Sequence, residues 1–134
     1  METIIAKKST EKLNGTFTEV GDNYKYEYTL KDGKPDGKYT IFFKNGQPAA
    51  TRYFKNGVLD GEFKVYHENG QLETKCTYVN GKVEGEHLCY SEDGRLESRN
   101  EYKNGVLDGI CILFDKVGGV SIDIFKNGKH VGRR

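Results

Sequence analysis

Hydrophobic and polar residues alternate along the chain in short runs that Asn-Gly and Asp-Gly pairs separate. The runs are rich in aromatic and β-branched residues, and none shows the apolar period of an amphipathic helix. Alternation with a period of two is typical of strands. Asn-Gly and Asp-Gly favour type I′ turns, because both central residues of such a turn need positive φ. The pattern therefore predicts consecutive β-hairpins.

The same turn sequence returns at a fixed interval. The segment Tyr53–Gly61 reappears 24 residues later as Thr77–Gly85 and again as Glu101–Gly109. A second turn signal lies between these copies, at Asn45-Gly46, Asn69-Gly70 and Asp93-Gly94. Two turns per interval indicate two antiparallel strands per unit. We predict one repeat domain with units at 37–60, 61–84, 85–108 and 109–132, a degenerate unit at 13–36 with its turn near Gly21 and Asp22, and an N-terminal segment at 1–12.

Strand pairing follows if Asn69-Gly70 forms a two-residue loop. Glu68 then faces Gln71, and residue numbers across the hairpin add to a constant. This register places an aromatic ring across from a strand glycine in every unit, which covers bare backbone. The expected pairs are Gly37 with Phe54, Gly61 with Tyr78, Gly85 with Tyr102 and, in the shortened last unit, Gly109 with Phe125. A bulged loop would shift the register by one residue and swap the two faces.

The register sorts the aromatic residues onto two faces. One face carries the glycine-covering rings among mostly apolar neighbours and is the better core candidate. The other face carries one ring per unit among charged residues, and we predict that it meets solvent and binds a partner through Phe42, Tyr66, Tyr90 and Phe114. Tyrosine is enriched in interface hot spots, which favours this interpretation. The alternative is that these four rings pack together and close a curled sheet.

The repeat resembles a known family. The residues that carry the resemblance are Asp60–Leu72 (DGEFKVYHENGQL) and Tyr78–Gly85 (YVNGKVEG), with good matches over 37–132 and a poor one over 13–36. They resemble the MORN repeat, and most closely the bacterial variant found in antitoxin-like proteins. The chain lacks the Trp and the His-Gly pair of the eukaryotic pattern. The resemblance implies an all-β fold, an elongated and twisted antiparallel meander of tandem hairpins, and a role in protein–protein contact as an antitoxin or immunity protein.

Composition narrows the classes of partner. The chain has 21 basic and 20 acidic residues and a net charge of +1, so no single-sign field attracts nucleic acid or a membrane. No apolar run approaches the roughly 18 residues of a membrane span. The apolar stretch Ile4–Ala6 is too short for a signal peptide. We expect a cytoplasmic chain whose partner is another protein, such as a toxin. The alternatives are a peripheral lipid-surface module and a homo-oligomer that pairs through the open sheet edges.

Residue types that carry catalysis are scattered. His67, His87 and His130 fall in different units, and the chain has no HExxH, P-loop or Gly-x-Ser-x-Gly motif. The three cysteines form no CxxC pair, which favours free thiols in a reducing compartment. We therefore predict that the chain is not an enzyme and has no catalytic, cofactor-binding or metal site.

One acidic residue precedes a glycine in each unit, at Asp36, Asp60, Glu84 and Asp108. Such a row could be a cation-binding edge or could serve the turns. Equivalent positions lie two strands apart, roughly 9 to 10 Å. A calcium ion needs oxygen ligands within about 2.6 Å. The spacing favours a role in the turns.

Overall fold

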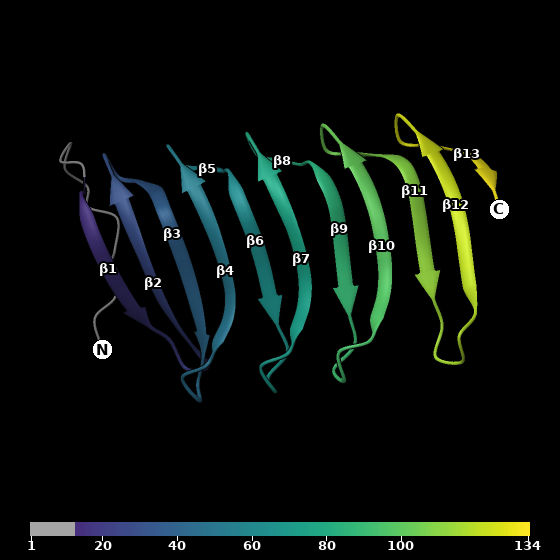
Figure 1. Cartoon of the computed structure of the whole chain (residues 1–134). Coiled ribbons are helices and arrows are strands. Elements are labelled where there is room, and N and C mark those ends of the chain that lie inside the picture. The colour runs from purple at the N-terminus through teal and green to yellow at the C-terminus, as the bar shows by residue number, and fades with distance from the viewer. Residues whose placement is uncertain (1–12) are drawn as a thin grey trace.

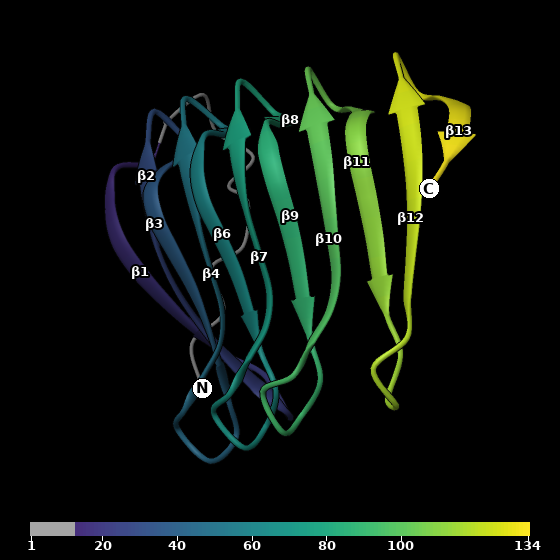
Figure 2. The same ribbon diagram turned by 45° about the vertical axis from the view of Figure 1, so that its right-hand side comes forward.

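The computed structural model describes residues 13–134, which form one antiparallel sheet of 13 strands. The strands lie side by side in chain order, from β1 at one end to β13 at the other (Figure 1). The strands are β1 (Gly15–Val20), β2 (Tyr24–Lys31), β3 (Lys34–Phe43), β4 (Pro48–Lys55), β5 (Val58–Leu59), β6 (Gly61–Tyr66), β7 (Leu72–Val79), β8 (Lys82–Val83), β9 (Gly85–Tyr90), β10 (Leu96–Lys103), β11 (Val106–Phe114), β12 (Val120–Lys126) and β13 (Lys129–Arg133). The predicted all-β meander is confirmed. A second view shows the twist of the sheet (Figure 2).

Residues 13–134 contain no helix that is long and apolar enough to cross a membrane. The expectations for Ile4–Ala6 and for the N-terminal segment 1–12 lie outside the described residues.

The predicted type I′ turns join consecutive strands along one of the two sides of the sheet at which strands end. This side is distinct from the open edges formed by the outer strands. Their first central residues are Asp32, Asn56, Asn80, Asn104 and Asn127, with φ between 49° and 52°. The glycine that follows each of them has φ between 79° and 83°. Positive φ at both positions is the signature of the type I′ turn. These turns lie at the top of Figure 1, and we call this edge the turn edge.

The opposite edge, here called the loop edge, differs from the prediction. In the β6–β7 hairpin the His67 N–H donates to the Gln71 carbonyl at 2.8 Å, and the Gly70 N–H donates to the His67 carbonyl at 2.9 Å. Gly70 has positive φ, whereas Asn69 does not. The loop therefore holds three residues and ends in a glycine bulge, so the predicted pairing of Glu68 with Gln71 is wrong.

A second bulge restores the predicted register. The pairing shifts by one residue between Val65 and Tyr66, so that Phe63 faces Cys76 and Gly61 faces Tyr78 as expected. The pairs Gly37–Phe54, Gly85–Tyr102 and Gly109–Phe125 are also confirmed. The β11–β12 hairpin has no such restoring bulge. This explains why the last unit is one residue shorter than the others.

The sheet has one better-buried face, here called face A, which carries the glycine-covering rings. Its most buried side chains are Tyr28 and Cys76, with 7% and 3% exposure. Rings from neighbouring strands are in contact, with centroids 5.0 Å apart for Tyr28 and Tyr39 and 5.4 Å for Phe63 and Tyr78. No side chain in the described part of the chain is less than 2% exposed. The core is thus a single layer of rings along face A. The opposite surface is called face B.

Candidate functional site

The recurring acidic residues join each unit to the next. Each carboxylate accepts a hydrogen bond from the backbone N–H of the first turn residue one unit later. The pairs are Asp36 with Asn56 (3.0 Å), Asp60 with Asn80 (3.1 Å), Glu84 with Asn104 (3.0 Å) and Asp108 with Asn127 (3.3 Å). The carboxylates therefore serve the turns, as the spacing favours. Within residues 13–134 no group of three or more His, Cys, Asp or Glu side chains is placed to hold a metal ion.

The second N–H of each turn is satisfied in the same way. The glycine N–H donates to the carbonyl that precedes the acidic residue, in the pairs Gly57–Pro35, Gly81–Leu59, Gly105–Val83 and Gly128–Leu107, at 2.7 to 2.9 Å. Leu13 and Asn14 take the same roles for the first turn, since the Leu13 carbonyl accepts from Gly33 at 2.7 Å and the Asn14 Oδ1 from Asp32 at 3.0 Å. The degenerate first unit is therefore bonded like the others.

The four predicted binding rings lie on face B near the loop edge. Their cross-strand partners occupy equivalent places, in the pairs Phe42–Pro48, Tyr66–Leu72, Tyr90–Leu96 and Phe114–Val120. All four rings are half-buried. Within the described chain no ring contact joins any two of them. The structure thus brings them into one row without packing them against each other. Partner binding by this row stays a prediction.

Charged side chains around this row are largely paired. Lys25 lies 3.2 Å from Glu27, and its ammonium also lies 4.7 Å from the centroid of the Phe42 ring. Lys64 lies 3.3 Å from Glu62. Arg99 forms an ion pair with Glu86. Because opposite charges neighbour each other, face B presents rings on a nearly neutral background.

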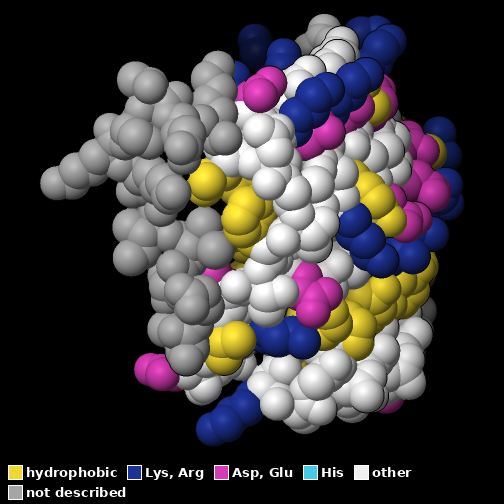
Figure 3. Space-filling model, turned by 90° about the vertical axis from the view of Figure 1, so that its left-hand side faces the viewer, with side chains coloured by type: hydrophobic (Ala, Val, Ile, Leu, Met, Phe, Trp, Pro, Cys, Tyr) yellow, Lys and Arg dark blue, Asp and Glu magenta, His cyan; other side chains and the backbone are white. Residues whose placement is uncertain are grey.

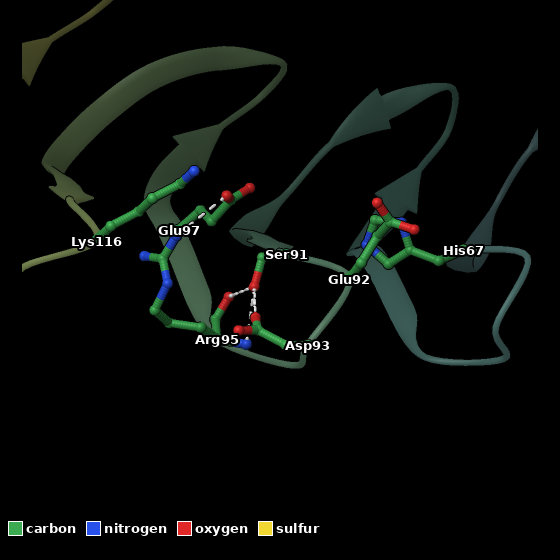
Figure 4. Close-up of a pocket in the computed structure, with 7 residues that line it drawn as sticks. All are labelled: His67, Ser91, Glu92, Asp93, Arg95, Glu97 and Lys116. Carbon is green, nitrogen blue, oxygen red and sulfur yellow. Dashed lines mark hydrogen bonds and ion pairs between the residues drawn. The ribbon is translucent and has the colours of Figure 1, made fainter.

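An open depression of about 730 Å³ lies at the loop edge, between the β6–β7, β9–β10 and β11–β12 loops (Figure 4). His67 Nε2 lies 2.9 Å from the Tyr90 carbonyl, and the Arg95 guanidinium donates to the Phe114 carbonyl at 3.3 Å. The Ser91 hydroxyl donates to the Asp93 carboxylate (Figure 4). Activation of a serine needs a hydrogen-bonded base such as imidazole. Among the described residues Ser91 and His67 share no hydrogen bond. These polar groups hold the loops together.

Burial changes the pKa of five ionisable side chains on face A. It lowers the pKa of His87 and raises the pKa of the Cys76 and Cys111 thiols. The pKa values of Tyr78 and Tyr102 are also raised, with burial as the main cause. The neutral forms of these five side chains are favoured, so the pKa changes at Cys76 and Cys111 oppose thiolate formation.

Arg52 on strand β4 is a residue of face A that the sequence patterns do not single out. Its guanidinium carbon lies 5.0 Å from the centroid of the Tyr39 ring and 5.9 Å from that of Phe54. The other units have non-basic residues at this place, namely Tyr28, Cys76, Asn100 and Asp123. The one available signal was this break in the repeat.

Three of the units match a known protein family. A family model described as a MORN repeat variant matches residues 35–56, 59–80 and 83–104. A comparison with curated proteins gave no match. Residues on either side of the matched region form hairpins whose turns make the same two hydrogen bonds, at Gly33 and at Gly128. The structural repeat therefore extends beyond the matched segments in both directions.

Proposed function

The chain belongs to the MORN-repeat family, and from this premise we propose that it is a non-catalytic scaffold that binds another protein. The observation that carries the proposal is the row Phe42, Tyr66, Tyr90 and Phe114 on face B. Successive rings are two strands apart, about 9.6 Å, on a sheet whose strands are fixed by hydrogen bonds on both sides. A surface that is formed before binding loses little conformational freedom when a partner docks.

We further propose that the partner is a bacterial toxin, which the scaffold sequesters by covering its functional surface. The resemblance of Asp60–Leu72 to antitoxin-like repeats supports this class of partner. The free thiols of Cys76, Cys89 and Cys111 suit the cytoplasm, where such a partner would be met. A toxin reading frame next to the gene, whose product this chain neutralises on co-expression, is the expected finding.

Affinity capture from the native host tests the scaffold itself. We expect a stoichiometric protein partner that is bound at least about tenfold more weakly after Tyr66→Ala and Tyr90→Ala, because buried interface tyrosines are common hot spots. Tyr53→Ala is the matched control, since Tyr53 also lies on face B but near the turn edge. Recovery of no stoichiometric protein would contradict the proposal. Equal weakening by all three variants would reject the row as the contact surface.

The competing lipid-surface module makes a different prediction. It requires binding to acidic vesicles that weakens as salt is added. The paired charges of face B disfavour it. Vesicle sedimentation at two salt concentrations separates the two functions.

A further inference from the structure

We propose that face A carries a second binding site, centred on Arg52, for an extended peptide segment that bears a carboxylate two residues away from an apolar side chain. The inference rests on the proposed protein-binding function and adds a location and a ligand chemistry to it. The site lies on the face opposite to the ring row of Phe42, Tyr66, Tyr90 and Phe114.

The guanidinium of Arg52 is held in place but lacks an anionic partner. Its Nε is buried without a hydrogen-bond partner, and it is the one side-chain nitrogen or oxygen in the described chain with this property. Within residues 13–134 Nη1 and Nη2 also make no hydrogen bond, and neither is fully buried. Within residues 13–134 Arg52 forms no ion pair. Contacts with the rings of Tyr39 and Phe54 orient the planar guanidinium, whose N–H donors form a fork.

Such a fork is suited to a carboxylate. The planar guanidinium can donate two parallel hydrogen bonds to the two oxygens of one carboxylate. Rings on its flanks reduce its contact with water, which strengthens a bond to an anion. They also fix its direction before a ligand arrives, so little side-chain freedom is lost on binding.

An apolar pocket lies directly beside Arg52 on the same face. It has a volume of about 280 Å³ and is lined by Tyr24, Tyr26, Ile41, Phe43, Ala49, Ala50 and Val65. Arg52 pairs with Tyr39, and the next pair toward the loop edge on this face is Ala50 with Ile41. Seen from the β1 side, hydrophobic side chains are exposed in patches between charged ones (Figure 3).

The spacing of the two features defines the ligand. Ala50 and Arg52 are two residues apart on one strand, which is about 7 Å. Side chains at positions i and i+2 of an extended peptide have the same spacing and the same direction. A segment with an acidic residue and an apolar residue in this relation can fill both features at once.

Charge on face A favours a discrete carboxylate over a lipid surface. Among residues 13–134, the strand lysines Lys38, Lys64 and Lys75 lie on face B, so none of these three cations adjoins Arg52 on face A. Glu19 on face A accepts a hydrogen bond from the Tyr28 hydroxyl at 2.6 Å. Stable attraction to an acidic membrane takes a cluster of basic residues. A single fork between rings fits a single carboxylate.

Two tripeptides test the site on the purified chain. Acetyl-glutamyl-glycyl-phenylalanine amide offers the carboxylate and the ring, and its glutaminyl counterpart differs only in charge and in one donor. We expect the glutamyl peptide to bind at least about tenfold more tightly and to shift the Arg52 Nε–H resonance in an NMR titration. Equal affinities, or binding of neither peptide, would overturn the proposal.

Variants assign the contact to its residues. Arg52→Gln should abolish the preference for the glutamyl peptide, and Arg52→Lys should keep only part of it, because an ammonium lacks the fork. Ala50→Leu, which fills the pocket, should weaken the binding of both peptides. This variant still tests the site if Arg52→Gln fails to fold. Tyr66→Ala on face B should change neither affinity. An Arg52→Gln variant that retains the full preference would refute the assignment.

The outcome separates this site from the scaffold proposal. Capture of a partner through Tyr66 and Tyr90 without tripeptide discrimination leaves the scaffold standing and removes the Arg52 site. A preference for the glutamyl peptide without any captured protein supports the Arg52 site and contradicts the scaffold proposal. Arg52-dependent binding to acidic vesicles, with no preference between the peptides, would replace the peptide by a lipid headgroup and overturn the proposal.

Discussion

The turn edge and the loop edge of the sheet are built by the same repeat and follow different rules. At the turn edge, five turns use the same two kinds of acceptor, an acidic or Asn side chain and the carbonyl before it, and in four of them both acceptors belong to the preceding unit. At the loop edge, the residue that opens the loop changes from Phe43 to His67, Ser91 and Asp115. The bonds between units also change there, from Asn69 with the Glu92 carbonyl to Arg95 with the Phe114 carbonyl.

The difference lies in where the backbone N–H groups find partners. Turn-edge N–H groups such as those of Asn80 and Gly81 point to the preceding unit and need its acceptors. Loop-edge N–H groups are satisfied inside their own loop, as when Gly70 donates to the His67 carbonyl and Gln71 to the Asn69 side chain. Because an unpaired N–H is costly, one edge must keep its sequence and the other is free to vary.

The largest expected effect comes from crowding the turn edge. Gly81 has a φ of +82°, and a Cβ at this position would lie 3.2 Å from Val58 Cγ1 of the preceding unit. We expect Gly81→Ala to reduce the free energy of unfolding by about 2 to 3 kcal/mol, from backbone strain and from the forced shift of Val58. Urea unfolding measures it. Gly70→Ala at the loop edge, with φ +91° and open space, should cost about 1 to 1.5 kcal/mol. Equal losses would remove the distinction between the edges.

Removing one turn-edge acceptor should have the next largest effect. Asp60→Ala deletes the acceptor of the Asn80 N–H and should cost about 1 kcal/mol of unfolding free energy. Asp60→Asn keeps an oxygen there and should recover most of the loss. Glu68→Ala at the loop edge should stay within about 0.5 kcal/mol of the wild type. A loss at Glu68 as large as at Asp60 would show that the loop edge bears equal stability.

Between the edges, stability should depend on pH through His87. Burial lowers its pKa, so the folded state binds a proton less readily than the unfolded chain, whose histidine pKa is about 6.5. Stability is therefore complete above pH 6.5 and declines as the pH falls below it, because protons bind preferentially to the unfolded chain. His87→Phe, which copies Phe63 of the preceding unit, should flatten the decline in urea unfolding between pH 7.5 and 5.5. Ser98→Ala, also on face A, should leave it intact, and a persistent decline in His87→Phe would disprove the role of His87.

The smallest expected effect concerns a bond that only some loops make. The Asn69 side chain donates to the Glu92 carbonyl at 2.7 Å and accepts from the Gln71 N–H at 2.9 Å. Asn69→Asp keeps the acceptor and loses the donor, at a cost of about 0.5 kcal/mol because the bond is exposed. Asn45→Asp is the matched control, since among the described residues the Asn45 side chain makes only the bond within its loop, to the Gln47 N–H at 2.8 Å. Thermal unfolding of both variants would show whether the cross-unit bond matters, and identical melting temperatures would exclude it.

The patterns in the sequence predicted the register of the sheet but missed the form of the loops. Gly61 opposite Tyr78 followed from the repeat, because ring and glycine recur at a constant separation. The pairing of Glu68 with Gln71 failed, because Asn-Gly can close a two-residue turn or end a three-residue loop. A bulge between Val65 and Tyr66 then cancelled the error. The repeat in the sequence fixes only the total offset between paired residues. Two one-residue irregularities that cancel therefore cannot be detected from it.

The candidate sites differ in the same way. The row Phe42, Tyr66, Tyr90 and Phe114 could be found because one ring recurs in each unit, and the structure places all four on one face. Arg52 could not be found by recurrence, since it stands alone at its place in the repeat. Its environment consists of Tyr39 and Phe54 from the two strands of one hairpin, and within residues 13–134 no carboxylate forms an ion pair with it. That environment exists only once the strands are assembled.

The sequence by itself determined the unit length, the two turns per unit, the chain-order meander and the residues that share each face. These features depend on φ preferences and on the two-residue period, which are local properties of the chain. Only the tertiary structure decided which acceptors satisfy the turn N–H groups, how the loops close, and that Arg52 lies between two rings beside an apolar pocket. These depend on stacking and twist, because they join residues from strands and units whose relative positions no local preference fixes.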